Sequence, residues 1–149
     1  MLRYRSTGEV HKDFHGLFCA TLHYLIDNYG IDAVKTVLTK TAQNVYKTMH
    51  ESLKNGDPEE LIEFWEYYLT RENGKFSIER KENEIILTVH DCPALRHLVE
   101  LKQPSDHIFC EGTKIFMSAL TEGSEFESDV KSTGEFSCVQ VLKKRSGDL

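Results

Sequence analysis

The sequence has little proline and glycine, three and nine among 149 residues, which excludes a collagen-like chain or a flexible linker. It has no apolar run near the roughly 18 residues that a membrane-spanning helix needs. A basic excess is also missing, because 18 Lys and Arg stand against 24 Asp and Glu, giving a formal net charge of −6. Such a chain cannot neutralise phosphates over a broad face. We therefore expect neither a nucleic acid nor a membrane as partner.

Several standard signals are missing as well. The chain contains no G-x-G-x-x-G, no Walker A loop and no G-x-S-x-G nucleophile elbow. The basic start at 1–5 is not followed by the apolar segment of a signal peptide, so a cytoplasmic location is expected. In a reducing compartment the four cysteines are expected to be free thiols. An aromatic content of 10 % indicates an ordered chain rather than a disordered one.

The first half of the chain has the periodicity of helices. Apolar spacing predicts one helix over 11–30, a second over about 32–54, and a third that begins at Asp57 with Pro58 in its first turn. The predicted buried stripe of the first helix consists of Phe14, Leu17, Phe18, Leu22, Leu25 and Tyr29.

From Asn73-Gly74 onward the period falls to two residues, which is typical of strands. We predict a hairpin over 75–90, helical segments over 94–101 and about 107–121, and two closing strands over 125–131 and 135–143. Strands in hairpin pairs favour an antiparallel sheet. The predicted class is therefore α+β, with N-terminal helices packed on an antiparallel sheet of two hairpins and an intervening helix. One domain is expected over 1–149, with a helical half at about 11–72 and a sheet-rich half at about 73–143.

Four side chains with useful chemistry recur every four residues in the first predicted helix: His11, His15, Cys19 and His23. A thiolate and an imidazole four residues apart can share a metal or a proton, which makes His15 an acid–base candidate. Zinc needs three or four ligands, however, and two neighbours do not complete a site. The simpler interpretation is a polar boundary on an amphipathic helix.

The segment His90–Leu98 holds the second candidate, Cys92, where a strand ends and a helical turn begins. Backbone N–H groups at a helix start favour a thiolate and so lower the pKa of the thiol. His90 and His97 are candidate bases or ligands, and Arg96 is a candidate for holding a carboxylate in bidentate fashion. A helix cap with surface His and Arg explains the same residues equally well.

Cys110 and Cys138 are the remaining thiols. Cys110 lies near the start of the helix that follows Pro104, with His107 three residues before it, and a core position is at least as good an explanation. Cys138 falls inside the last strand, where a lone cysteine usually belongs to the core.

These residues carry a resemblance to a known family. The segment Cys92–Leu98, a helix opened by Cys110 and a closing strand with Gly134 and Cys138 resemble proteins grouped with L-2-amino-thiazoline-4-carboxylic acid hydrolase, over about residues 8–143. The N-terminal helix with His11 and His15, ending at Gly30, fits as well. The resemblance implies hydrolytic opening of a thiazoline ring. More distantly, the chain resembles 4-vinyl reductase domains, which are small-molecule-binding modules, some of them with zinc held by cysteine.

Three hypotheses follow, each with a small molecule as partner and each compatible with a homo-oligomer. The first is a cytoplasmic hydrolase of a small C–N or thiazoline-type cyclic substrate. In it Cys92 or Cys110 is nucleophile or ligand, His97 or His15 is the acid–base group, and Arg96 is a carboxylate clamp. The second is a non-enzymatic binding or sensor domain. The third is a structural zinc site; any other cofactor is unknown. Its ligands would be Cys92, Cys110, Cys138 and His97. All three require distant thiols to meet around a hollow lined by imidazole and guanidinium.

Overall fold

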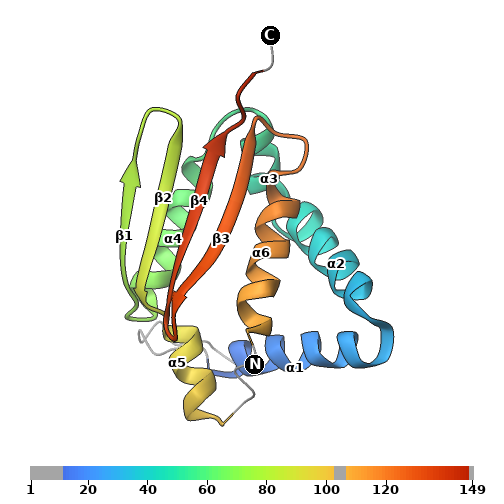
Figure 1. Cartoon of the computed structure of the whole chain (residues 1–149). Coiled ribbons are helices and arrows are strands. Elements are labelled where there is room, and N and C mark those ends of the chain that lie inside the picture. Colours follow the sequence, from blue (N-terminus) through green and yellow to red (C-terminus); the bar gives the residue numbers. More distant parts are fainter. Residues whose placement is uncertain (1–11, 103–106, 148–149) are drawn as a thin grey trace, which may run out of the picture.

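The computed structural model describes residues 12–102 and 107–147 (Figure 1). The helical elements are α1 (Lys12–Tyr29), α2 (Ile31–Lys40), the π-helical turn η1 (Thr41–Val45), α3 (Lys47–Lys54), α4 (Glu59–Arg71), α5 (Pro93–Glu100) and α6 (Ile108–Thr121). The strands are β1 (Lys75–Arg80), β2 (Glu84–Asp91), β3 (Phe126–Gly134) and β4 (Ser137–Lys144). Of the helices in the described ranges, none combines the length and hydropathy needed to cross a membrane.

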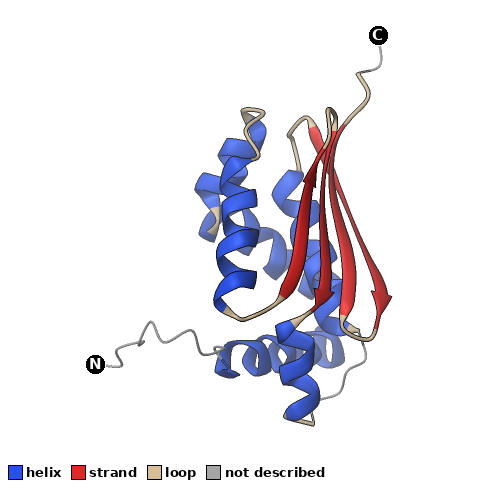
Figure 2. Ribbon diagram, turned by 90° about the vertical axis from the view of Figure 1, so that its left-hand side faces the viewer, coloured by secondary structure: helices blue, strands red, loops and turns tan. Residues whose placement is uncertain are grey.

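The four strands form one antiparallel sheet in the order β1-β2-β4-β3. The two hairpins meet along β2 and β4, where Leu87 pairs with Gln140 and Val89 with Cys138. Figure 2 shows the helices gathered on one side of this sheet. The predicted α+β class, with N-terminal helices, two hairpins and an intervening helix, is therefore confirmed.

The main core lies between the covered face of the sheet and helices α4 and α6. Trp65 of α4 and Leu120 of α6 are 4 % and 0 % exposed, and they share one buried cluster with Leu87 and Leu142 of the sheet. Their positions follow from the periodicity of each element, because apolar residues of α4 recur along one face and those of the strands alternate. Apolar packing on this covered face holds the helices against the sheet.

A smaller apolar cluster joins α1, α2 and α6 around Leu22, Val34 and Leu38. The approach of α1 to α6 depends on Gly112, since a Cβ at that position would lie 2.8 Å from a terminal carbon of Leu22. This contact fixes α1 beside the N-terminal half of α6. It thereby positions the residues of α1 described below.

Two details of the predicted helices are wrong. The predicted second helix is broken by η1, in which the N–H of Tyr46 bonds to the carbonyl of Thr41, and α3 starts only after Tyr46. In α1 the predicted buried residues Phe14, Leu17 and Tyr29 are exposed, at 54 %, 69 % and 67 %. The buried face instead includes His15, whose Nε2 has a hydrogen-bond partner in Glu72 at the end of α4.

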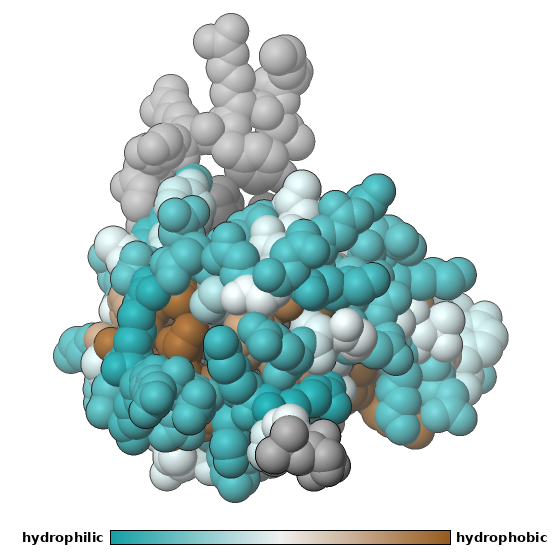
Figure 3. All heavy atoms as spheres, turned by 90° about the horizontal axis from the view of Figure 1, so that it is seen from above, coloured by the Kyte–Doolittle hydropathy of each residue, from teal (hydrophilic) through white to brown (hydrophobic). Residues whose placement is uncertain are grey.

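The end of the molecule away from α1 and α5 is seen in Figure 3. Hydrophilic residues predominate on this surface, and apolar residues show only between them. The features with chemical interest lie at the opposite end, where α1, α5 and the start of α6 meet the end of the β3–β4 hairpin (Figure 1).

Candidate functional site

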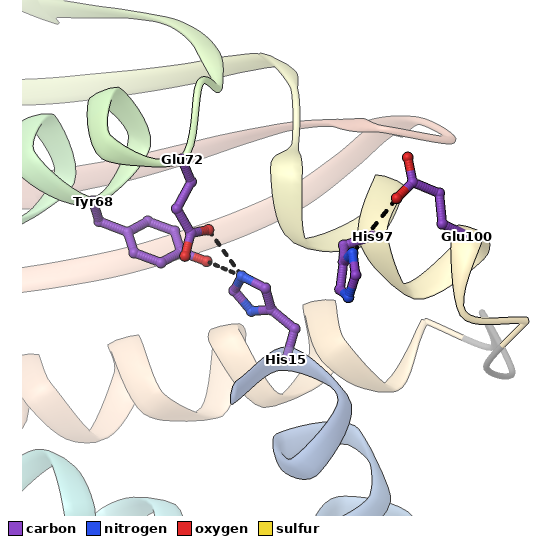
Figure 4. A network of polar contacts seen from close by, with 5 residues as sticks. All are labelled: His15, Tyr68, Glu72, His97 and Glu100. Atoms are coloured by element: carbon purple, nitrogen blue, oxygen red, sulfur yellow. Dashed lines mark hydrogen bonds and ion pairs between the residues drawn. The ribbon is translucent and has the colours of Figure 1, made fainter. Parts of the chain in front are cut away.

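His15 and Glu72 form a buried hydrogen-bonded pair between α1 and the C-terminal end of α4 (Figure 4). The two residues are 0 % and 4 % exposed. Nε2 of His15 lies 2.8 Å from Oε2 of Glu72, and the Tyr68 hydroxyl lies 3.3 Å from the same nitrogen. A buried carboxylate is costly unless it accepts hydrogen bonds. The three side chains therefore depend on one another.

This geometry assigns the proton on the His15 ring. The Glu72 carboxylate only accepts hydrogen bonds, so Nε2 of His15 is the donor. The Nδ1 of the same ring is buried, and no hydrogen-bond partner for it is found among the described residues. The ring is enclosed by aromatic edges, including Phe109 of α6 at 5.8 Å between ring centroids.

Tyr68 completes the pair as a permanent donor. Burial raises the pKa of its phenol far above the ordinary value. The negative charge of Glu72, which also accepts a hydrogen bond from the hydroxyl, raises this pKa further. The hydroxyl therefore stays protonated, and the Glu72 carboxylate has two donors.

A second buried imidazole, His97, comes from α5 and is 4 % exposed. Its Nδ1 lies 3.6 Å from Oε2 of Glu100, and its Nε2 is buried without a hydrogen-bond partner in the described part of the chain. In Figure 4 the ring of His15 points from α1 toward Glu72 and Tyr68, and the ring of His97 lies on α5 beside Glu100. Among the residues that the structure describes, each ring thus has one nitrogen near a carboxylate and one without a hydrogen-bond partner.

Arg96 is held in place from two directions. Its Nε donates to Oδ1 of Asp91, and its guanidinium carbon lies 4.6 Å from the centroid of the Phe136 ring. The Arg96 side chain is 53 % exposed. Its remaining N–H groups therefore stay accessible from solvent, while its orientation is fixed.

Arg96 and His97 share a depression of about 300 Å³, which we call the polar hollow. Its described lining consists of Glu72, Asn73, Asp91, Pro93, Arg96, His97 and Glu100. Two predicted catalytic residues, Arg96 and His97, therefore line one hollow. A third, His15, does not line it but is hydrogen-bonded to Glu72, which does.

Cys92 precedes α5 directly, as predicted, but it is not activated. Burial raises the pKa of its thiol to about 11, and the N–H groups of Leu95 and Ala94 at the start of α5 only partly oppose this rise. The helix start lowers this pKa, as predicted, but burial raises it by more, so the predicted activation of Cys92 is not found. Desolvation disfavours the thiolate more than the helix start favours it.

Cys110 and Cys138 lie in the same region as Cys92. Burial is the main cause of the raised pKa of all three thiols. A negative charge on Cys138 or Cys110 would raise the pKa of Cys92 further. Ser132, the strand partner of Cys138, hydrogen-bonds to Cys110. The thiols of three separate elements thus come near one another, but as protonated, half-buried groups.

No metal centre is assembled in the ranges that the structure describes. Within 12–102 and 107–147, no three His, Cys, Asp or Glu side chains gather in an arrangement that could hold a metal ion. The predicted zinc ligands Cys92, Cys110, Cys138 and His97 do not form such a group. His97 in addition turns Nδ1 toward Glu100.

A second depression of about 300 Å³, which we call the apolar hollow, lies between α1, α5, α6 and the end of the β3–β4 hairpin. Its described lining consists of Cys19, Leu95, Leu98, Val99, His107, Ile108, Phe109, Gly134, Glu135 and Phe136. Phe109 connects this hollow to the buried pair, because the same ring contacts His15. Of the four cysteines, Cys19 lines it.

The predicted hollow shared by thiols, imidazole and guanidinium is thus divided. Arg96 and His97 line the polar hollow, Cys19 lines the apolar one, and Cys92, Cys110 and Cys138 line neither. His11 lies outside the described residues.

Sequence reasoning missed Glu72 and Tyr68. Their spacing of four residues, which puts them on one face of a helix, was the available signal.

No protein-family model matches the chain, and comparisons with curated proteins and with solved structures found no match either.

Proposed function

We propose that the chain is a small-molecule-binding domain and that its ligand occupies the apolar hollow. The observation that carries this proposal is the form of the hollow. Ligand pockets are typically concave spaces of roughly 300–1,000 Å³ with a mainly apolar lining and a few polar groups. The apolar hollow, at about 300 Å³, lies at the lower end of this range, and His107 and Glu135 contribute an imidazole and a carboxyl group to its lining.

The raised pKa values of the thiols favour ligand binding over catalysis by a cysteine nucleophile. A pKa of about 11 leaves about one Cys92 thiol in 10,000 ionised at pH 7. A nucleophilic cysteine needs a neighbouring base or a lowered pKa. Burial raises the pKa of Cys110 and Cys138 as well, so the first hypothesis in its thiol-dependent form has little support.

The lining indicates the kind of ligand. Leu95, Leu98 and Ile108 offer aliphatic surface, and Phe109 and Phe136 offer rings on which a flat molecule can stack. A small apolar ring with one polar substituent fits this lining, with its polar group toward His107 or Glu135.

Indole is a suitable probe, and Val99 and Val37 give a matched pair of variants. Both valines are 41 % exposed on helices, but Val99 lines the apolar hollow and Val37 does not. We expect saturable binding of indole, with about 1.4 kcal/mol of stabilisation at ten times its Kd. Val99→Trp should weaken binding at least tenfold by filling the space, and Val37→Trp should not.

The controls separate the hollow from the exposed apolar surface of α1. Leu17→Lys should leave indole binding unchanged, because Leu17 lies on that surface at 69 % exposure. Absence of saturable binding to the unmodified chain, or equal weakening by both tryptophan variants, would overturn the proposal.

Hydrolysis of a small C–N or thiazoline-type substrate is a second candidate, favoured by one observation. Arg96 and His97 line the same hollow, so a guanidinium for a substrate carboxylate stands next to an imidazole, the side chain most often used as a general base. Water then replaces Cys92 as the nucleophile. The test is turnover of 2-amino-thiazoline-4-carboxylate, with His97→Gln expected to abolish it and Cys92→Ala to retain it. No turnover by the unmodified chain would reject this candidate.

A further inference from the structure

One face of the four-stranded sheet is covered by helices, and none of the described helices lies on the other face (Figure 2). Successive residues of a strand point to opposite faces, so the neighbours of the buried Leu87 and Leu142 point to this uncovered face. Four side chains of the two central strands lie side by side there: Ile86, Thr88, Val139 and Val141. All four are only partly buried. We call them the outer strip.

The uncovered face has two rows of paired residues that run across all four strands. The first row is Ser77, Thr88, Val139 and Lys131, and the second is Glu79, Ile86, Val141 and Asp129. The Lys131 ammonium lies 3.0 Å from the Asp129 carboxylate and lowers its pKa through a hydrogen bond, so Asp129 is charged at neutral pH. The outer strip is therefore bordered by charged or polar residues on both edge strands.

The two rows are complementary to each other when a second copy is turned in one particular way. A two-fold axis between the rows and perpendicular to the strands lays the first row of each copy on the second row of the other. Lys131 then faces Asp129 of the second copy, and Ser77 faces Glu79. The outer strips cover each other, and every contact occurs twice. A two-fold axis parallel to the strands instead places Glu79 against Asp129 of the second copy, which is unfavourable because both are carboxylates.

We infer that the uncovered sheet face binds a second copy of this chain, in a homodimer whose two-fold axis is perpendicular to the strands. The outer strips exclude water from the centre of the contact, and the charged residues of the edge strands fix its orientation. Packed sheets cross at about 30°, and the long side chain of Lys131 can span the resulting displacement at the edge. The inference does not depend on a ligand in the apolar hollow.

The size of the face predicts a weak dimer. Four strands about 4.8 Å apart, with about eight residues each and about 3.3 Å per residue, present a face of about 500 Å² on each copy. The total of about 1,000 Å² is at the lower end for a specific interface. We therefore expect a Kd on the order of 10–100 μM.

Sedimentation velocity between about 1 μM and about 1 mM measures this association, and two variants with reversed charge test its geometry. Lys131→Glu makes positions 129 and 131 both acidic, and Asp129→Lys makes both basic. Each variant alone opposes like charges across the two-fold axis, so its dimer should be weaker by about tenfold or more. In an equimolar mixture the acidic positions of one chain face the basic positions of the other. The mixture should therefore regain the association of the unmodified chain.

Lys47→Glu is the matched control. It makes the same change in net charge in another exposed pair, because Lys47 and Glu51 lie 3.6 Å apart on α3, on the covered side of the sheet. The Kd of the dimer should not change in this variant. The recovery on mixing also separates the interface from a fault in folding, since two misfolded chains would not regain association.

The outcomes are distinct. A chain that stays monomeric up to about 1 mM overturns the inference. Equal weakening by Lys131→Glu and Lys47→Glu would do the same, in favour of unspecific repulsion between acidic chains. A dimer that does not recover when the two variants are mixed would also overturn it, and would assign the contact to another surface. Indole binding by the apolar hollow can succeed or fail independently of these results.

Discussion

The His15–Glu72 pair gives the sharpest stability prediction. His15→Phe keeps an aromatic ring in the space between α1 and α4 but removes the donor 2.8 Å from Glu72. The Glu72 carboxylate, 4 % exposed, is then left with the Tyr68 hydroxyl as its donor. Removing one partner of a buried pair typically costs about 3–5 kcal/mol, because the other remains buried without compensation. We expect a loss of about 3 kcal/mol, near the lower end, since Tyr68 remains.

A variant of Glu72 tests whether the uncompensated buried charge causes this loss of stability. Glu72→Gln keeps an acceptor oxygen for Nε2 of His15 and removes the charge, so the expected cost is only about 1 kcal/mol. In the double variant His15→Phe/Glu72→Gln the buried charge is gone. Its cost should therefore fall short of the sum of the single variants by at least about 1 kcal/mol, since residues in direct contact couple.

Urea unfolding followed by circular dichroism at pH 7 measures these values. For a chain of about 150 residues, a loss of 3 kcal/mol lowers Tm by roughly 6–12 °C. His90→Phe is the control, because His90 is exposed and changes there usually cost less than about 0.5 kcal/mol. A cost below about 1 kcal/mol for His15→Phe, or additive effects in the double variant, would refute the assigned pair.

Three further predictions concern packing, reactivity and pH. Gly112→Ala should cost about 1–3 kcal/mol in urea unfolding, because its Cβ would lie 2.8 Å from Leu22, whereas Gly16→Ala, with its nearest contact at 3.6 Å, should be neutral or stabilising. In labelling of the native chain by iodoacetamide, the rate at Cys92 should rise steadily with pH toward its pKa of about 11, and a plateau near pH 8 would contradict the assigned burial. The raised pKa of Cys92 also makes the free energy of unfolding depend on pH. The contribution of the protonated thiol is fully present below its ordinary pKa of 9.0 and is lost as pH rises toward 11. Unfolding measured at pH 7 and pH 10 should therefore show a smaller loss in Cys92→Ala than in the unmodified chain.

The fold class was predictable because each segment of the chain has one clear period. Apolar spacing of 3.6 residues before Asn73, alternation in the hairpins after Gly74 and the helix starts between them locate most elements within a few residues of their observed bounds. The break at Tyr46 could not be predicted in this way. Its ring packs against Phe64 and Phe116, which are distant in sequence, and a π-helical turn leaves the apolar spacing of the chain almost unchanged.

The buried face of α1 shows why the site was only partly predictable. Hydropathy alone placed Phe14 and Leu17 inside, but the buried position is taken by His15, whose Nε2 is hydrogen-bonded to Glu72. A partner 57 residues away leaves no local signature. Arg96 and His97 were identified because they follow a helix start that the sequence does mark, at Pro93.

The most direct test of the binding proposal is a methyl-resolved NMR titration of the unmodified chain with indole. The proposal predicts saturable shifts at the methyl groups of Leu95, Leu98, Val99 and Ile108, which line the apolar hollow, with no change at Leu53 and Leu61 of the main core. Shifts confined to the exposed Leu17, or no saturable shift at any methyl group, would contradict it.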